Sequence, residues 1–183
     1  MQLGISSYSL YQAMHQGKMN IEDVFHWVAE LGASHIELVP GLGFDFSEDG
    51  HLEARLVELA KSLSLELSNY AIGANFITKD EASYEAEIAR VISEVDRAAR
   101  LGIKRMRHDV ASREDTSILR FNEDLEHLAS ACRRIADHAA QYGIITSVEN
   151  HGYYIQASDR VQTLVHAVDR PNFRTTLDVG NFV

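Results

Sequence analysis

Short apolar segments alternate with longer amphipathic ones along this chain, and this alternation limits the possible folds more than any other feature. The apolar segments have the length of buried strands, and we place six of them at residues 2–7, 34–39, 64–70, 103–109, 143–149 and 174–178. Between them, apolar residues recur at helical spacing. Gly32, Gly102 and Gly143 each separate a helical segment from the strand that follows. A repeated strand–helix unit of this kind predicts a parallel α/β fold.

The helical segments carry recognisable start signals. Asn20 and Asn122 are predicted N-caps, because an asparagine side chain accepts hydrogen bonds from the amides of the first turn. Acidic residues follow Asn122, and negative charges in the first turn interact favourably with the positive end of the helix dipole. The remaining helices are predicted from Leu52 to Ala60, from near Ser83 to Ala99, and from Ser158 to a point before Pro171.

Two parallel layouts compete for these elements. A doubly wound sheet has a glycine-rich phosphate loop after its first strand, but here Ser6 and Ser7 follow without a glycine cluster. Polar residues instead end nearly every strand, as they do at the catalytic face of a (β/α)8 TIM barrel. We therefore predict a TIM barrel. A barrel needs eight strands in about 250 residues, so we expect residues 1–183 to form a single barrel domain with about six βα units, incomplete at its C-terminal end.

Composition limits the partners and the location of the protein. Hydrophobic residues make up 45% of the 183 residues, and the formal net charge is −10, which opposes binding to nucleic acid. Cys132 is the single cysteine, a pattern that favours a reducing compartment. The sequence has no apolar leader and no apolar segment of membrane-spanning length. We expect a cytoplasmic protein with neither a membrane nor a nucleic acid as partner.

Two carboxylates stand at the ends of neighbouring predicted strands. Glu149 ends the fifth strand and Asp178 ends the sixth, and the carboxyl ends of adjacent parallel strands lie close together. Two carboxylates at one edge repel each other unless they are protonated or bridged by a cation. Oxygen ligands of this type suit a divalent metal. The alternative is that each acid caps the next helix or pairs with a lysine.

Four motifs resemble those of a known family. They are Gly4–Ser6, His35–Leu38, Ser147–Gly152 and Leu177–Phe182. Together they resemble the xylose-isomerase-like TIM barrels, the sugar phosphate isomerase/epimerase group related to AP endonuclease type 2. In that family a divalent metal is held by a Glu of strand five, an Asp of strand six, a His of strand seven and a Glu of strand eight. The first two map onto Glu149 and Asp178, and the other two would lie beyond Val183.

The resemblance implies a function. It implies a divalent metal (Mn, Mg, Co or Zn) and an isomerase, epimerase or related lyase that acts on a small sugar, keto-sugar or polyol. The reaction would be an enediolate-type proton transfer, with Glu149 both a metal ligand and the catalytic acid and base. Two positions depart from the ketose 3-epimerases of the family, since Ile155 and Asn181 stand where those enzymes have an acid and a histidine.

Four further residues are predicted substrate contacts. His108 ends strand four and His151 shares a face with Glu149, while Glu37 ends strand two and Asn181 follows Asp178. For His108 the alternative is a hydrogen-bonded histidine at a strand end, and for Glu37 it is a bond to backbone amides.

Two other functions remain open at this point. One is a nuclease of the AP-endonuclease type, which the acidic net charge and Asn181 oppose. The other is a catalytically inactive barrel that serves as a binding module, which the missing acid at Ile155 favours. Six strands would leave the edges of the first and the last one open, so we also expect either self-association into a homo-oligomer or an empty metal site.

Overall fold

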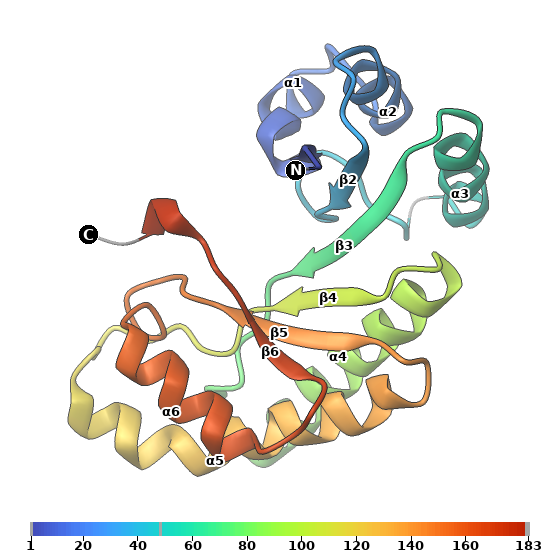
Figure 1. Cartoon of the computed structure of the whole chain (residues 1–183). Helices are drawn as coiled ribbons and strands as arrows, with labels where there is room; N and C mark the ends of the chain where they lie inside the picture. Colours follow the sequence, from blue (N-terminus) through green and yellow to red (C-terminus); the bar gives the residue numbers. More distant parts are fainter. Residues whose placement is uncertain (1, 48, 182–183) are drawn as a thin grey trace. The chain divides into compact units, whose positions relative to one another are not determined.

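The computed structural model describes residues 2–47 and 49–181, so Phe182, the last residue of the sixth-strand motif, lies outside the described residues. Six parallel strands alternate with helices along the chain (Figure 1), which confirms the predicted α/β fold. The chain divides into two compact units. The first runs to Ala71 and includes Ala98–Lys104, and the second contains Ile72–Arg97 and the chain from Arg105 onward.

The first unit contains the sheet order β1-β2-β3. Its strands are β1 (Gly4–Ser6), β2 (His35–Leu38) and β3 (Glu66–Ile72), and its helical segments are η1 (Ser7–Leu10), α1 (Tyr11–His15), α2 (Ile21–Glu30) and α3 (Leu52–Ser62). Asn20 forms the predicted N-cap of α2. Its Oδ1 accepts from the Asp23 amide at 2.8 Å, and Asp23 Oδ2 accepts from the Asn20 amide at 2.9 Å. This reciprocal pair satisfies two amides that a helix start leaves without partners.

The second unit contains the order β4-β5-β6. Its strands are β4 (Arg105–His108), β5 (Ile145–Glu149) and β6 (Phe173–Thr176), and its helical segments are α4 (Glu81–Arg100), α5 (Ile118–Ala140), α6 (Ser158–Val168) and η2 (Val179–Asn181). Helices α5 and α6 lie side by side on one face of β5 and β6 (Figure 1). The parallel register pairs Arg107 with Ser147 and Glu149 with Thr176. The carboxyl ends of β4, β5 and β6 therefore meet at one edge.

Helix α5 begins four residues before the predicted start at Asn122. Ser117 is the N-cap, and its Oγ accepts from the Arg120 amide at 3.4 Å. Ile118 and Leu119 in the first turn are exposed. Ile118, Phe121 and Leu125 continue the helical spacing into this turn. The late start was predicted from the cap signal of Asn122 and the acidic residues that follow it.

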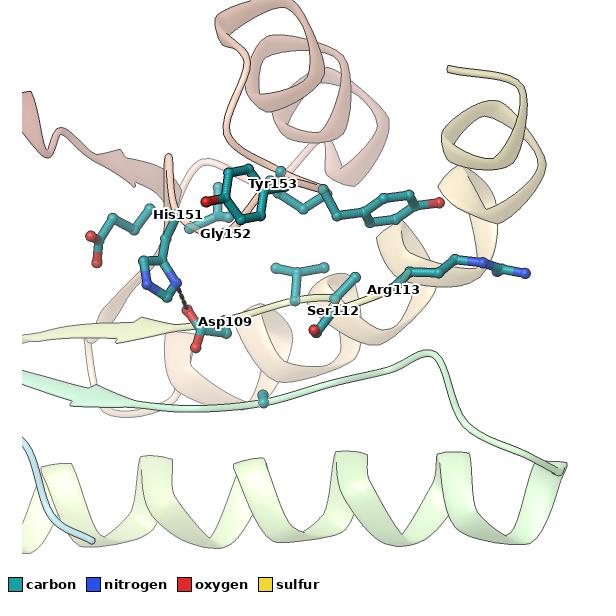
Figure 2. Close-up of a pocket in the computed structure, with 13 residues that line it drawn as sticks. Asp109, Ser112, Arg113, His151, Gly152 and Tyr153 are labelled. Carbon is teal, nitrogen blue, oxygen red and sulfur yellow. Dashed lines mark ion pairs between the residues drawn. The ribbon is translucent and has the colours of Figure 1, made fainter. Parts of the chain in front are cut away.

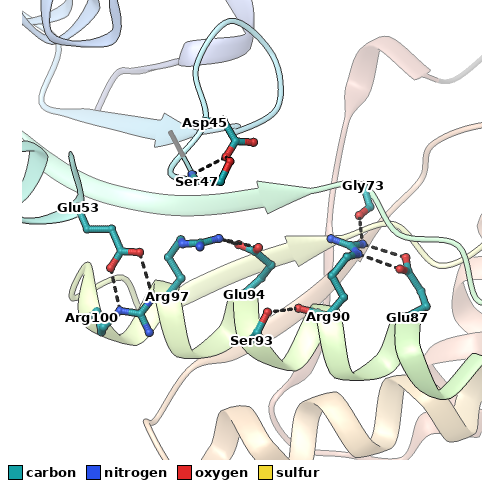
Figure 3. A network of polar contacts seen from close by, with 10 residues as sticks. All are labelled: Asp45, Ser47, Glu53, Gly73, Glu87, Arg90, Ser93, Glu94, Arg97 and Arg100. Carbon is teal, nitrogen blue, oxygen red and sulfur yellow. Dashed lines mark hydrogen bonds and ion pairs between the residues drawn. The ribbon is translucent and has the colours of Figure 1, made fainter. Parts of the chain in front are cut away.

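A network of polar contacts along α4 fixes the loop after β3 (Figure 3). Arg90 donates from Nη2 to the Gly73 carbonyl at 2.7 Å and from Nε to Glu87 Oε2 at 2.8 Å. Glu87 Oε1 accepts from the Asn75 amide at 3.0 Å. The hydrogen bond from Arg90 holds the pKa of the Glu87 carboxyl below its usual range. Helix α4 thereby positions the segment from Gly73 to Asn75, which leads into the pocket described below.

Candidate functional site

An ion pair joins the ends of β4 and β5. Arg107 Nε donates to Glu149 Oε2 at 2.5 Å, and the two side chains are only 15% and 12% exposed. The register that pairs Arg107 with Ser147 brings the guanidinium beside Glu149, two residues further along β5. Because both groups are largely buried, solvent and salt screen the pair weakly. The positive charge of Arg107 thus holds Glu149 in place, and the sequence analysis did not assign Arg107 to the site.

Arg107 also contacts a second carboxylate. Its Nη1 lies 3.2 Å from Asp109 Oδ1 and donates to the Ile72 carbonyl at 3.3 Å. Asp109 Oδ1 lies 3.5 Å from His151 Nδ1. One guanidinium therefore bridges Glu149 and Asp109, and Asp109 extends the network to His151.

Two asparagines link Glu149 to Asp178. The Asn150 side chain accepts from the Asp178 amide and donates to the Asp178 carbonyl, both at 2.8 Å. Asn181 donates from Nδ2 to Glu149 Oε1 at 3.1 Å. Asp178 is half-buried, and its Oδ1 accepts from the Gly180 amide at 2.7 Å. The structure thus brings together Glu149, Asp178 and Asn181, three of the residues predicted from the sequence.

A pocket of about 310 Å³ opens beside this network (Figure 2). Asp109, Glu149 and His151 contribute to one wall, and the loops after β4 and β5 form the rest. Figure 2 shows His151 turned toward Asp109, with Ser112 and Arg113 on the loop after β4 and Tyr153 on the loop after β5. The Tyr153 side chain is 83% exposed. The pocket therefore presents carboxylates, an imidazole, a hydroxyl and an aromatic ring to a small molecule.

A buried cluster holds the two loops that line the pocket. Asp124 accepts from the Tyr154 hydroxyl at 2.7 Å and from Arg113 at 2.6 Å. Burial raises the pKa of the Tyr154 hydroxyl, and its bond to Asp124 raises that pKa further. Arg160 donates to the carbonyls of Tyr154 and Thr116, at 2.9 and 2.6 Å. These bonds join the start of α5 and the start of α6 to the loops, and so they fix the pocket wall.

A family profile described as "Xylose isomerase-like TIM barrel" matches residues 25–183. The chain belongs to this family. The family and the TIM-barrel fold predicted from the motifs are thereby confirmed. No curated protein sequence matches the chain.

Solved structures share the fold of this xylose isomerase-like chain at low sequence identity. The probable 3-DHS dehydratase AsbF of Bacillus anthracis, involved in petrobactin synthesis, has a TM-score of 0.81 at 17% identity, and the match covers 100% of this chain and 64% of that one. The IolI protein with a bound zinc atom has a TM-score of 0.80 at 17% identity, with the same coverage. D-psicose 3-epimerase of Clostridium cellulolyticum H10 with D-tagatose has 0.78 at 17% identity, covering 99% and 64%. At such identities the likeness shows the fold alone.

Two of the predicted substrate contacts lie elsewhere in this xylose isomerase-like chain. His108 is fully buried between the rings of Phe76 and Phe173, and its Nδ1 donates to the Asp109 carbonyl at 2.8 Å. It does not line the pocket. Glu37 belongs to the first unit, where its Oε2 accepts from Asn69 Nδ2 at 2.6 Å. For both, contact with a substrate stays a prediction.

The residues of the site fit a divalent metal in donor type. Carboxylate oxygens such as those of Glu149 and Asp178 are the hard ligands that divalent cations prefer. Among the residues that the structure describes, no three His, Cys, Asp or Glu side chains are grouped closely enough to hold a metal ion. For Glu149 and Asp178, the role of metal ligand stays a prediction, and Arg107 supplies the positive charge at Glu149 in this structure.

Several residues of the site were missed by sequence reasoning. The sequence analysis did not assign Arg107, Asp109 or Asn150 to the site. All three lie within or beside the strand ends whose other residues were assigned to it. The spacing of Arg107 and Asp109 carries a signal, because residues two apart on a strand share a face. The same alternation puts His108 on the opposite face, with the buried Met106.

No helix among the described residues combines the length and the apolar character that crossing a membrane requires.

Proposed function

We propose that the protein is a divalent-metal-dependent isomerase or epimerase that acts on a small sugar, keto-sugar or polyol by enediolate-type proton transfer. The observation that carries the proposal is the position of Glu149. Its carboxylate lies in the wall of the 310 Å³ pocket and is linked through Asn181 and Asn150 to the segment that carries Asp178. The chain spans 64% of the length of the solved relatives, so the activity is proposed for the whole protein.

The volume of the pocket supports a small substrate, because ligand sites begin at about 300 Å³. Asp109, His151 and Ser112 offer hydrogen-bond partners to hydroxyl groups, and Tyr153 offers an apolar face. Glu149 and Asp178 would hold the cation, which when bound supplies electrostatic stabilisation of the charge that develops on substrate oxygens. Glu149 would take and return the carbon-bound proton. Arg107 and Asn181 orient its carboxylate for that transfer.

Partners and location belong to the same proposal. We infer a small-molecule substrate, with neither nucleic acid nor membrane as partner, from the net charge of −10 and the pocket. The free thiol of Cys132 is buried in the core, which supports a cytoplasmic location.

Proton exchange at the substrate carbon tests the proposal. The whole protein is loaded with Mn²⁺, Mg²⁺, Co²⁺ or Zn²⁺ and incubated in D₂O with a panel of free ketoses, aldoses and polyol-derived ketones, and deuterium incorporation is followed by NMR. We expect exchange with at least one substrate and a loss of about 100-fold or more in Glu149→Gln, the range that general acid–base groups contribute.

The matched control is Glu126→Gln, since Glu126 is an exposed surface acid of α5 that should leave exchange unchanged. Absence of exchange with every substrate and metal would refute the proposal. Cleavage of abasic-site DNA by the same metal-loaded chain would replace it with a nuclease.

A further inference from the structure

Arg107 occupies the position beside Glu149 where a divalent cation would bind. Its Nε lies 2.5 Å from Glu149 Oε2, and Asn181 binds the other carboxylate oxygen at 3.1 Å. Both oxygens of Glu149 thus have partners in this structure. A divalent cation that binds Oε2 must displace the guanidinium or share that oxygen with it.

The charge of Arg107 makes this exchange unfavourable. A guanidinium remains protonated throughout the pH range in which proteins fold, so a change of pH does not release it. Its charge also repels a divalent cation that approaches the same carboxylate. Because the Arg107 and Glu149 side chains are only 15% and 12% exposed, water reduces this repulsion less than it would at the surface.

Further contacts of Arg107 would hold the guanidinium in the site after it releases Glu149. Nη1 is held by Asp109 Oδ1 at 3.2 Å and by the Ile72 carbonyl at 3.3 Å, while Nε binds Glu149. Release of Glu149 therefore breaks one contact of the fork and leaves the Nη1 contacts in place. The side chain does not have to leave the site for a cation to reach Glu149.

We infer that Arg107 is a built-in counter-ion of Glu149 that competes with the divalent cation and thereby sets the cation affinity of the site. The inference rests on the proposed function in one respect, namely that Glu149 is a cation ligand. Arg107 is a positioning residue in this account, because it acts on the reaction through Glu149. Asp109 is its second anchor.

Cation affinity tests the inference without any assay of activity. Mn²⁺ is titrated into the whole protein and into its Arg107→Gln variant, and binding is measured by calorimetry and by the paramagnetic resonance of free Mn²⁺. We expect Arg107→Gln to bind Mn²⁺ at least about tenfold more tightly, because close charge pairs of this kind are strongly coupled. Arg107→Lys keeps the charge and loses the fork, so its affinity should stay nearer to that of the unmodified chain.

Arg134→Gln is the matched control. Arg134 pairs with Glu85 on the exposed side of α5 and does not line the pocket, so its removal should leave the Mn²⁺ affinity within about twofold of the starting value. Circular dichroism of each variant checks that it is folded, and Arg107→Met is the second charge-removing variant if Arg107→Gln does not fold.

The outcomes separate this inference from the proposed function. Equal or weaker Mn²⁺ binding by Arg107→Gln, with binding by the unmodified chain, would overturn the counter-ion role alone. An absence of Mn²⁺ binding in both would overturn the counter-ion role and the metal dependence together, because the variant leaves Glu149 and Asp109 without their counter-ion.

Discussion

His108 contains a fully buried imidazole that the proposed reaction does not use. Its Nε2 has no hydrogen-bond partner within the part of the chain that the structure describes, and burial lowers its pKa below the ordinary value of 6.5. The folded protein therefore keeps this ring neutral at pH values where the unfolded chain protonates it.

The sign of the pH dependence follows from that difference. Below about pH 6.5 the unfolded state binds a proton that the folded state does not, so the free energy of unfolding falls as the pH falls. One group contributes a slope of at most about 1.4 kcal/mol per pH unit. We expect His108→Phe to flatten the decline between pH 7.5 and 5.5, as measured by urea unfolding. The exposed His166→Gln is the control, and an unchanged slope in His108→Phe would contradict the prediction.

Single residues of the site differ in how far the sequence reveals them. Glu149 and Asp178 stand in distinctive strings at strand ends, so their residue types and their spacing were enough to propose them as site residues. The pair of Arg107 and Glu149 depends on the register of two strands that are about 40 residues apart in the chain, and hydrophobic patterning does not encode that register between buried parallel strands. The charge network of the site therefore required the structure.

Helix α5 shows at the element scale which features patterning detects. Its middle carries the fully buried Leu128, Cys132, Ile135 and Ala139 at helical spacing, and this part was predicted. The first turn was missed because Asn122 offered a stronger cap signal than Ser117. The elements η1 and α1 were missed because they are too short to show an apolar periodicity.

Two leucines of α5 provide a matched comparison of stability. Leu128 is fully buried and Leu119 is 64% exposed. We expect Leu128→Ala to lower the free energy of unfolding by about 2–5 kcal/mol, because it removes apolar contacts and leaves a cavity. Leu119→Ala should change it by about 0.5 kcal/mol or less. Chemical denaturation of both variants measures the difference, and equal effects would mean that the helix packs differently from the arrangement described.

At the scale of the whole molecule, the β6 edge presents apolar groups to solvent. Among the described residues, β6 pairs with β5 along one side, and Leu177 and Val179 just beyond it are 68% and 79% exposed. A groove of about 330 Å³ between β6 and α6 includes Val161 and Val165. Unpaired strand edges recruit other chains.

We expect residues 1–183, when expressed alone, to self-associate through this edge. The expected result is a mass above that of the monomer in light scattering after size exclusion, rising with protein concentration. Leu177→Lys should shift the equilibrium toward monomer, because charged side chains discourage edge pairing. Leu31→Lys is the control, because Leu31 is also an exposed leucine but lies at the end of helix α2 and not at a strand edge. A monomer at all concentrations would rule out association through β6.

The Asn150 side chain forms hydrogen bonds with the backbone amide and carbonyl of Asp178, and these bonds have a consequence for protein engineering. The amide and the carbonyl of residue 178 are both held by Asn150, and these two contacts do not depend on which side chain residue 178 carries. The chemical identity of that position is therefore open to replacement while its location is kept. A designer who wished to give this scaffold a different reaction would vary residue 178 first and leave Asn150 untouched.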